Sequence, residues 1–416
     1  MVCQGQLDVV MRIACILTVF PSVTETFIFG DLRALKDSGH DVGLMHFLDG
    51  SCDIWQKDAR VLRENVLIGG PLVSPGVFAA FVGYLVRRPI RLIRTLLWIV
   101  LHRGSSIRGR LKTLLILPKC VQFASECKRW RADRVHAAWS NHAAIAALVI
   151  QRLNGTPFSM ASHAGQDVFR DPVMLREKVA GASFVAVCNR ATFGRLLEIA
   201  DPEDHRKLVL LSHGVDLETF DVERSAPQGS SPRRIVFVGR LAYGKGIAYL
   251  IEAARLLHEG GVEFRLDLFG DGPERAATRE SIEQLGIADQ VQMYGEVSQE
   301  DVAGALVQAD LLVLPSELRH DGGREGLPNV LLEAMAAGVP VVASRIASVE
   351  QAVQDGVTGL LVPQRDPESL ATAMRRVFDE PELTHRRVVA AREMVRESFD
   401  RKVCGRRFVS LFEETR

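Results

Sequence analysis

The residues of this 416-residue chain whose types and spacing best suit chemistry form a cationic, glycine-rich loop in the C-terminal half. A predicted strand at 234–238 is followed by Gly-Arg-Leu-Ala-Tyr-Gly-Lys-Gly at 239–246 and then by a helical pattern. This spacing nearly matches the phosphate-binding loop G-x-x-x-x-G-K-[ST], but Gly246 stands where a hydroxyl would ligate magnesium, which disfavours a nucleotide hydrolase. Arg240 and Lys245 could hold a diphosphate through charge and backbone donors, or could simply belong to a surface loop.

Two glutamates eight positions apart form a second candidate site. Pro328 is a favourable first helical residue and Gly338 a favourable stop, which places Glu325 just ahead of a helix and Glu333 inside it. The amides and dipole of that helix N-terminus favour a diphosphate, so Glu333 could accept hydrogen bonds from ribose hydroxyls while Glu325 meets the sugar. Taken singly, each glutamate is better explained in simpler terms, Glu325 as a dipole-stabilising acid and Glu333 as an ordinary helical residue.

Two alternations of strands and helices must position these residues. The first opens with a strand at 12–20, a helix at 24–38 and a strand at 41–47, the βαβ unit of a doubly wound domain. It continues with a predicted helix at 143–153 and strands at 158–162 and 182–187. The second contains predicted strands at 234–238, 264–269, 291–294, 311–314 and 339–343.

A polar segment rich in Ser, Pro and Gly at 221–232 separates the two alternations and is predicted to be a linker. We therefore expect an N-terminal domain at 1–220 and a C-terminal domain at 233–395. The remaining residues, 396–416, are expected to form a C-terminal helix that packs back on the N-terminal domain.

The net charge is zero, with 51 Lys and Arg against 51 Asp and Glu, which argues against a nucleic-acid-binding protein. The zero conceals two opposite halves: residues 1–210 hold 27 basic and 18 acidic residues (+9), and residues 211–416 hold 24 and 33 (−9). Two domains with different partners are indicated. The seven cysteines are scattered without a Cys-x-x-Cys pair, and the first apolar run is too short for a signal peptide, so we expect a reduced, cytoplasmic protein without a zinc site.

One segment, 76–131, departs from the alternation. Between 87 and 131 it holds 12 Lys and Arg against a single acid, Glu126. Its apolar residues are interrupted by Arg87, Arg88, Pro89, Arg91 and Arg94. These interruptions exclude a transmembrane span, which needs roughly 20 uninterrupted apolar residues. Either the segment is a basic amphipathic insertion on an anionic bilayer, which the extent of the charge favours, or its apolar face packs on its own domain and its arginines are merely solvated.

Taken together, these motifs resemble those of glycosyltransferase family 4, whose members have the GT-B fold. Glu-x7-Glu followed by Ala-Met-Ala-Ala-Gly at 334–338 is similar to the family signature, and loop 239–246 is similar to its phosphate-binding loop. Gly-Asp-Gly-Pro at 270–273 and His-Gly-Val-Asp at 213–216 resemble a turn and a domain crossing of the family.

The N-terminal half carries a more specific resemblance. Phe-Pro-Ser-Val-Thr-Glu-Thr-Phe at 20–27 and Ser-His-Ala-Gly-Gln-Asp at 162–167 are similar to the colanic-acid type of branch, which builds bacterial exopolysaccharides. The resemblance covers the whole chain in order. It implies an α/β, GT-B fold of two Rossmann-like, doubly wound domains facing a cleft.

The resemblance implies that a nucleoside diphosphate sugar, the donor, binds the C-terminal domain. Arg240 and Lys245 would neutralise the diphosphate and the charge that builds on it as the glycosidic bond breaks. Glu333 would bind the ribose, and His163 would reach the donor sugar from the N-terminal domain. The implied catalytic residues are His163, Arg240, Lys245 and Glu325, and the implied donor-binding residues are Arg240, Lys245, Glu296, Val297, Gly326, Leu327, Asn329, Val330 and Glu333.

The family also implies retention of the anomeric configuration and no metal or other cofactor, and the chain has no Asp-x-Asp motif. The chain departs from the family after its first strand, where many members have a glycine-rich turn and this chain has no glycine before Gly30. We assign the acceptor side to Ser22, Thr24 and Glu25, whose side chains could replace contacts to backbone amides.

We therefore expect a metal-independent, nucleotide-sugar-dependent hexosyltransferase of envelope or exopolysaccharide biosynthesis, peripheral on the inner face of the plasma membrane. Its partners would be the nucleotide sugar, a lipid-linked or polysaccharide acceptor and an anionic membrane surface. Two alternatives share the donor site: a nucleotide-sugar 2-epimerase of the same fold and a catalytically silent nucleotide-sugar-binding scaffold. A dinucleotide oxidoreductase is disfavoured, because no Gly-x-Gly-x-x-Gly follows the first strand.

Overall fold

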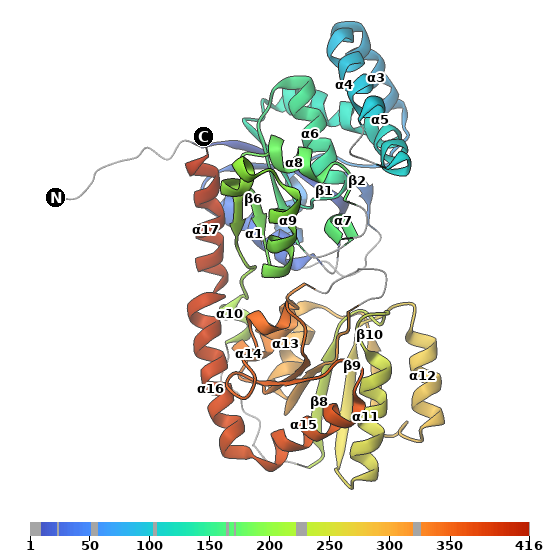
Figure 1. Cartoon of the computed structure of the whole chain (residues 1–416), viewed down its shortest axis with the longest axis vertical. Helices are drawn as coiled ribbons and strands as arrows, with labels where there is room; N and C mark the ends of the chain where they lie inside the picture. The colour runs from blue at the N-terminus through green and yellow to red at the C-terminus, as the bar shows by residue number, and fades with distance from the viewer. Residues whose placement is uncertain are drawn as a thin grey trace, which may run out of the picture.

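Two parallel β-sheets, one in each of two domains, form the framework of the computed structural model (Figure 1). The structure describes residues 10–22, 25–50, 57–102, 106–163, 166–169, 172–221, 231–318 and 326–415. From edge to edge, the N-terminal sheet consists of β3 (Val66–Ile68), β2 (Asp41–Asp49), β1 (Arg12–Phe20), β4 (Arg134–Ala137), β5 (Phe158–Ser162), β6 (Val185–Val187) and β7 (Leu208–Leu210). The C-terminal sheet consists of β10 (Val291–Gly295), β9 (Phe264–Phe269), β8 (Arg233–Val238), β11 (Leu311–Leu314), β12 (Val341–Ser344) and β13 (Leu360–Val362).

In each sheet the strand order reverses beside the first strand of the domain, β1 or β8, which is the doubly wound pattern. The predicted pair of Rossmann-like domains is confirmed. Four strands have the predicted bounds, at 12–20, 158–162, 264–269 and 311–314. The strands β3, β4, β7 and β13, of three or four residues each, were not predicted.

Helices cover both sheets. Those of the N-terminal domain are α1 (Thr26–Asp37), α2 (Lys57–Leu62), α3 (Pro75–Arg87), α4 (Pro89–Leu101), α5 (Ile107–Trp130), α6 (His142–Asn154), α7 (Gln166–Phe169), α8 (Leu175–Gly181) and α9 (Arg190–Ile199). Those that follow are α10 (Leu217–Phe220), α11 (Ile247–Glu259), α12 (Arg275–Gln284), α13 (Gln299–Val307), α14 (Asn329–Ala336), α15 (Pro367–Asp379), α16 (Pro381–Ser398) and α17 (Arg401–Glu414).

Strand β1 shows how the apolar runs of the sequence build the core. A parallel strand with helices on both faces of its sheet is buried on both sides, so its sequence reads as a continuous apolar run. Ile13, Cys15 and Leu17 point into the core shared with α1 and α17, and all three are 0% exposed. Ala14 and Ile16 point into the opposite core with α5 and α6. The apolar run of β1 therefore packs against a layer of helices on each face of the sheet.

The chain crosses between the domains twice, and the two crossings lie side by side. The amide of Val215 donates to the carbonyl of Phe399 at 2.8 Å, and the amide of Arg401 donates to the carbonyl of Val215 at 3.0 Å. Val215 and Phe220 are buried in the C-terminal core. The C-terminal domain therefore begins a few residues before the expected boundary at 220.

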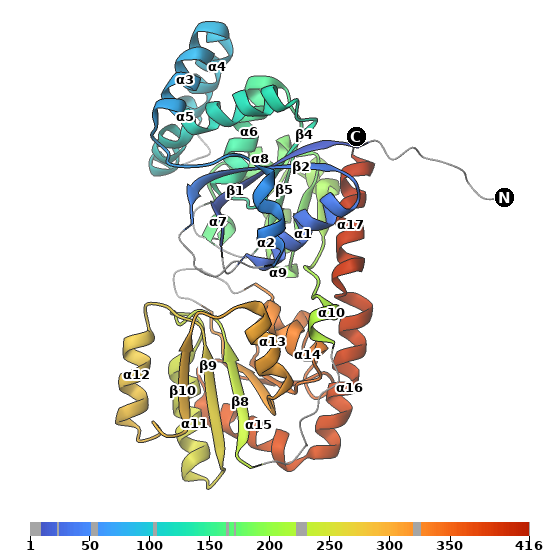
Figure 2. The ribbon, with the colours of Figure 1, turned by 180° about the vertical axis from the view of Figure 1, so that it is seen from behind.

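The last helix belongs to the N-terminal domain. Figure 2 shows α16 along the C-terminal domain and α17 continuing along the N-terminal domain. Phe408 and Phe412 of α17 are buried against the ring of His136, and Phe412 also contacts Phe184. Burying two phenylalanine side chains contributes roughly 3–6 kcal/mol. The end of the chain thus ties the two domains together.

The basic insertion forms α3, α4 and α5, which project from the end of the N-terminal domain remote from the C-terminal domain (Figure 1). Each helix has two apolar faces. On α4, Leu92 and Ile99 are buried against the domain, whereas Ile93 and Leu97 are 47% and 52% exposed. Packing on the domain therefore uses only one of the two faces.

We call the outer apolar faces of α3, α4 and α5 together the insertion face. They carry twelve of the 22 exposed large apolar side chains of the described residues, namely Phe78, Val82, Leu85, Val86, Ile90, Ile93, Leu97, Val100, Leu101, Ile107, Leu111 and Leu115. Clusters of exposed apolar side chains are typical of interaction surfaces. Within the described part of the chain, no helix is long and apolar enough to span a bilayer.

Candidate active site

A cleft of about 840 Å³ lies between the domains, at the carboxyl ends of strands from both sheets. In doubly wound folds this edge is where ligands bind. The N-terminal wall of the cleft consists of Thr26, Phe27, Trp139, His163, Cys188 and His213. The C-terminal wall consists of α14 and the segments that follow β8, β9, β10 and β11.

The structure brings most of the predicted site residues to this cleft. The C-terminal wall includes Arg240, Lys245, Glu296, Val297, Gly326, Leu327, Asn329, Val330 and Glu333, and His163 lines the wall opposite. Glu325 and Thr24 lie outside the described residues. Ser22 and Glu25 are described but do not line the cleft.

The loop at 239–246 explains why the phosphate-loop motif lacks its final hydroxyl. Gly246 has a φ of +68° and precedes α11, and a Cβ on this residue would lie 1.9 Å from the carbonyl oxygen of Pro315. Serine or threonine would face both the left-handed strain and this collision. Glycine at this position therefore has a steric reason. In the same loop Arg240 is exposed and Lys245 half-buried, and both line the cleft.

Glu333 is not an ordinary helical residue. It lies inside α14 yet is only 9% exposed and lines the cleft. Among the described residues, its Oε1 accepts one long hydrogen bond, from Gln299 Nε2 at 3.3 Å. Burial raises the pKa of Glu333 to about 7, and the bond from Gln299 opposes this rise. A buried carboxyl group with so little compensation can accept further hydrogen bonds from a ligand.

The N-terminus of α14 and the end of β10 complete the C-terminal wall. The helix begins at Asn329, one residue later than predicted, with Pro328 at its N-cap. The amides of Asn329 and Val330 belong to the first turn, whose amides have no partner inside a helix. Glu296 and Val297 directly follow β10. The amide of Gly270 donates to the carbonyl of Gly295 at 2.7 Å and ties this end to β9.

The N-terminal wall contains a chain of hydrogen bonds through two histidine rings, which we call the histidine pair, His163 and His213. Nε2 of His163 lies 2.8 Å from the carbonyl oxygen of Ala138, and its Nδ1 lies 2.9 Å from Nε2 of His213. Nδ1 of His213 lies 3.1 Å from Oδ2 of Asp31. His163 follows β5, His213 belongs to the domain crossing, and Asp31 belongs to α1.

The hydrogen-bond partners of the histidine pair show which of its ring nitrogens carry protons. A carbonyl and a carboxylate only accept hydrogen bonds, so His163 donates from Nε2 and His213 donates from Nδ1. Burial and the charge of His213 hold the pKa of His163 well below its usual value. The proton between the rings therefore lies on His213. Burial lowers the pKa of His213, but the charge and hydrogen bond of Asp31, with a hydrogen bond to Cys188, raise it to about 10.

Aromatic rings cover the histidine pair. The ring of Phe27 lies 5.0 Å from His163 and 4.5 Å from His213, and the ring of Trp139 lies 4.5 Å from His163. Both ring nitrogens of His163 have partners inside the protein. The expected contact of a His163 ring nitrogen with the donor sugar would require one of these bonds to break.

One group of side chains has the composition of a metal site. His163, Cys188 and His213 each offer one ligand atom, and these atoms lie within 4.8 Å of one another. However, the histidine nitrogens already bond to each other, to Ala138 and to Asp31. We therefore interpret this group as part of the hydrogen-bonded wall.

Glu25 contacts the N-terminal wall from beside the cleft. Its Oε1 accepts a hydrogen bond from Trp139 Nε1 at 3.0 Å, and its Oε2 is buried without a hydrogen-bond partner among the described residues. Burial raises the pKa of Glu25 to about 7, and the bond from Trp139 opposes this rise. The visible role of Glu25 is to orient Trp139.

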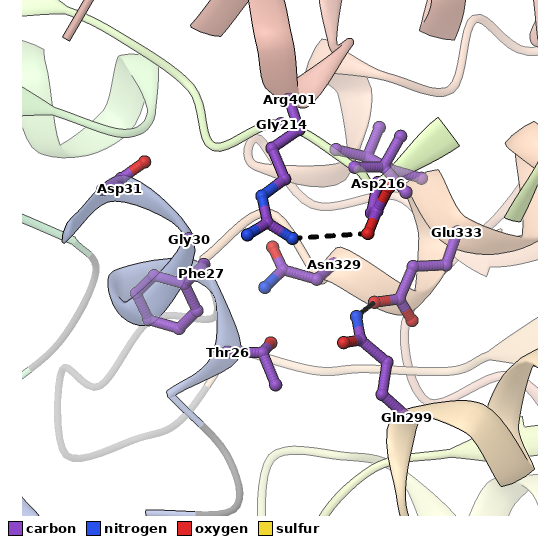
Figure 3. Close-up of a pocket in the computed structure, with 12 residues that line it drawn as sticks. Thr26, Phe27, Gly30, Asp31, Gly214, Asp216, Gln299, Asn329, Glu333 and Arg401 are labelled. Atoms are coloured by element: carbon purple, nitrogen blue, oxygen red, sulfur yellow. Dashed lines mark hydrogen bonds and ion pairs between the residues drawn. The ribbon is translucent and has the colours of Figure 1, made fainter. Parts of the chain in front are cut away.

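A smaller cavity adjoins the cleft at the domain crossings (Figure 3). Arg401, the first residue of α17, forms an ion pair with Asp58 of the N-terminal domain. Its Nη1 also lies 3.5 Å from Oδ2 of Asp216, in the first crossing. Glu333 and Gln299 line the same cavity. Arg401 thus links the crossings to the N-terminal domain beside the predicted ribose site.

Trp139, Cys188 and His213 line the cleft but were not predicted as site residues. Each lies within three residues of the end of a strand, respectively β4, β6 and β7. That position is the signal that could have found them. For Trp139 and His213 this position could not be recognised in the sequence, because β4 and β7 were not predicted.

The model of the family described as Glycosyl transferases group 1 matches residues 221–394. The chain is 28% identical over 424 residues to the putative colanic acid biosynthesis glycosyltransferase WcaL of Escherichia coli, covering 97% of this chain and 100% of the relative. It is 30% identical over 312 residues to alpha-D-kanosaminyltransferase of Streptomyces kanamyceticus, covering 69% of this chain and 79% of the relative.

Solved structures show the same fold. HepE of Anabaena in complex with UDP-glucose superposes with a TM-score of 0.70 at 16% identity, over 97% of this chain and 100% of HepE. At this identity the likeness concerns the fold alone. The two proteins thus share the same overall fold.

Proposed function

The chain belongs to the Glycosyl transferases group 1 family, and from this premise we propose that it transfers a sugar from a nucleoside diphosphate donor to a lipid-linked or polysaccharide acceptor. One observation carries the proposal: Arg240, Lys245 and the buried Glu333 line a single cleft. Two cations suit a diphosphate, and a buried carboxyl group suits the hydroxyls of a ribose. The binding of UDP-glucose by HepE, which has the same GT-B fold, supports a nucleotide sugar as the donor.

We place the reaction in exopolysaccharide biosynthesis. The support is the full-length similarity to WcaL, a putative glycosyltransferase of colanic acid biosynthesis. The protein would act in the cytoplasm, where nucleotide sugars are made, on a growing chain held at the inner face of the plasma membrane.

The proposed mechanism assigns the main work to electrostatics. As the bond between sugar and diphosphate breaks, negative charge builds on the leaving diphosphate, and Arg240 and Lys245 stabilise it. The amides of Asn329 and Val330, at the N-terminus of α14, add donors and a favourable dipole. Loss of one preorganised donor of this kind costs about 10²–10³ in kcat. Because the two cations supply the positive charge, the proposed reaction uses no metal.

We further propose that the transfer retains the anomeric configuration. An inverting transfer needs a general base on the acceptor side, opposite the leaving group. Among the described residues of the N-terminal wall, the candidate bases are the histidine pair and Cys188. His163 has both ring nitrogens engaged, and His213 is protonated by its pairing with Asp31. Cys188 is buried, and its Sγ already accepts a hydrogen bond from Asn189 Nδ2 at 3.3 Å. Retention, with the leaving diphosphate taking the acceptor proton, fits this wall better.

Substitution of the C-terminal wall tests the function. Arg240→Ala, Lys245→Ala and Glu333→Ala should each lower the transfer rate at least a hundredfold with the fold intact. Arg279→Ala is the matched control, because Arg279 is an exposed cation of α12 that does not line the cleft. Sugar transfer to membranes containing the natural acceptor is measured, with circular dichroism as the check on folding. Near-wild-type transfer in all three variants would contradict the proposal.

Incubation of the donor without an acceptor separates the two alternatives. An epimerase would convert the donor to its 2-epimer without any acceptor, which nuclear magnetic resonance of the nucleotide sugar would detect. A silent scaffold would bind the donor and show neither transfer nor slow hydrolysis. Either result would replace the proposed transfer.

We also propose that the insertion face attaches the protein to an anionic bilayer. Two observations support this attachment: the exposed apolar side chains of α3, α4 and α5, and the excess of basic residues between 87 and 131. Co-sedimentation with vesicles tests this. Attachment requires binding to phosphatidylglycerol vesicles at low salt that weakens as salt is added, and a protein that ignores these vesicles would contradict it.

A further inference from the structure

A hollow of about 420 Å³ lies between α4 and the end of α6, and none of its lining residues lines the cleft. Its apolar lining comes from Leu97, Trp98 and Leu101 of α4. Its polar lining comes from Arg94, Arg152 and His102. The hollow thus combines an apolar surface with two guanidinium groups.

The two arginines converge from different helices. The guanidinium of Arg152 lies over the ring of Trp98, 4.1 Å from its centroid, which fixes its position. Neither Arg94 nor Arg152 has a hydrogen bond or an ion pair with the described residues. Burial and then the charge of Arg94 lower the pKa of Arg152. The two like charges therefore destabilise each other, and an anion placed between them would relieve both.

The surrounding charges leave this place open for an anion. Arg91, one turn before Arg94 on α4, donates from Nη1 to the carbonyl of Leu153 at 2.8 Å. Its guanidinium therefore already has a partner inside the protein. The acidic side chain that contacts the lining is Glu177, whose Oε1 lies 3.1 Å from His102 Nε2, and Glu177 does not itself line the hollow. The guanidinium groups of Arg94 and Arg152 are therefore the charges that an entering anion would meet.

The hollow opens on the insertion face. Leu97 and Leu101 are 52% and 70% exposed, and the side chains beside them on the same face of α4 are Ile90, Ile93 and Val100. A free phosphate ion would gain nothing from this apolar surface. A lipid would place its phosphate between the arginines and its acyl chains against the apolar side chains.

We propose that this hollow is a binding site for the phosphate group of an anionic membrane phospholipid. Arg94 and Arg152 hold the phosphate, Trp98 holds Arg152 in place, and the exposed side chains of α4 contact the acyl chains. The proposal rests on the attachment of the insertion face to the bilayer and adds to it a defined lipid site. A second copy of the chain fits this surface less well, because an isologous contact centred on the hollow would bring the same arginines against one another.

The test compares two pairs of substitutions that remove the same charge. Arg94→Gln with Arg152→Gln empties the hollow of cations, and Arg87→Gln with Arg108→Gln removes two exposed cations of the same insertion that do not line it. Binding is measured with phosphatidylcholine vesicles that contain about one third phosphatidylglycerol. If charge acts only as a smooth surface potential, both pairs lose the same affinity, up to roughly thirty-fold. The lipid site predicts that the hollow pair loses at least ten times more than the control pair.

A spectroscopic measurement locates the contact. Phosphatidylglycerol with brominated acyl chains quenches the fluorescence of a tryptophan at the bilayer surface, and the lipid site predicts quenching that disappears in Trp98→Phe. Persistence of the full quenching in that variant would overturn the site. Unfolding temperature and nucleotide-sugar binding are measured for every variant, because both should stay at the wild-type level.

The other outcomes would contradict the lipid site or the attachment of the insertion face. Equal losses for the two pairs would overturn the lipid site and leave the attachment standing. Failure of the wild-type protein to bind anionic vesicles would overturn the attachment and with it the site, while leaving sugar transfer untouched. Equally tight binding of soluble glycerol phosphate without a bilayer, or a dimer that the hollow substitutions dissociate, would identify a different occupant.

Discussion

The two walls of the cleft satisfy their polar groups in opposite ways. In the C-terminal wall, Arg240 is exposed, and the buried Glu333 has a single long hydrogen bond to the described part of the chain. In the N-terminal wall, the histidine pair and Asp31 bond to one another beneath aromatic rings. The C-terminal wall thus leaves partners for a charged ligand to supply, whereas the N-terminal wall is already complete. The proposed donor would therefore meet electrostatic complementarity in the C-terminal wall and a preorganised, largely apolar surface in the N-terminal wall.

The largest expected effect concerns the loop that holds the cations of the C-terminal wall. Gly246→Ala should lower the free energy of unfolding of the C-terminal domain by about 4 kcal/mol, because left-handed strain and overpacking add. It should also abolish donor binding. Gly261→Ala is the control, since its φ is +74° but no atom lies within 4 Å of the added Cβ. Urea unfolding measures the stability of both variants. Equal losses of unfolding free energy in the two would show that the contact with Pro315 is unimportant.

The next effect concerns the completed N-terminal wall. His213 has a pKa of about 10 in the folded protein against 6.5 for the free side chain, so the folded state holds its proton more tightly. This stabilisation is fully present below pH 6.5 and is lost as the pH rises through 10. Asp31→Asn should remove most of this pH dependence and cost about 3 kcal/mol near neutral pH, because a buried charge loses its partner.

Urea unfolding between pH 6 and pH 10 measures this effect. The matched control is Asp37→Asn, which breaks the exposed pair with Arg33, whose Nε lies 2.7 Å from Oδ1 of Asp37. An exposed pair contributes about 0–1 kcal/mol, so the control should behave as wild type. An identical pH profile in Asp31→Asn and wild type would contradict the charged state assigned to His213.

The smallest expected effect concerns donor affinity as a function of pH, and it distinguishes Glu333 in the C-terminal wall from Glu25 beside the N-terminal wall. Glu333 and Glu25 both have a pKa of about 7, but only Glu333 lines the cleft. Ribose hydroxyls donate to a carboxylate, so donor affinity should be full above pH 7 and fall about tenfold per pH unit below it. Calorimetry with UDP-glucose measures this. Glu333→Gln should flatten the profile and Glu25→Gln should preserve it; the reverse pattern would place the ribose elsewhere.

Much of the C-terminal wall could be predicted from the sequence, because its chemistry is local. The loop at 239–246 holds its cations within eight residues, and the segment from Gly326 to Glu333 spans little more than two helical turns. Short spacings of this kind fix which side chains share a loop or a helix end. The burial of Glu333 was not predictable, since it depends on Gln299 and on helices distant in the sequence.

The N-terminal wall required the tertiary structure. Trp139, His163, Cys188 and His213 follow four different strands and meet only because those strands lie in register in one parallel sheet. The insertion shows the same division. Its basic charge and apolar content were readable from the sequence, whereas the structure decided that α4 packs through Leu92 and leaves Leu97 outside.

The sequence by itself determined the two alternations of strands and helices and the cationic loop, because each depends on the spacing of neighbouring residues. The predicted linker falls mostly on 222–230, which lie outside the described residues. Only the tertiary structure decided the protonation of the histidine pair, the raised pKa of Glu333 and the convergence of Arg94 with Arg152. The physical reason is that a proton's position and a carboxyl group's solvation depend on which atoms surround them. Those atoms come from segments that the chain brings together only when it folds.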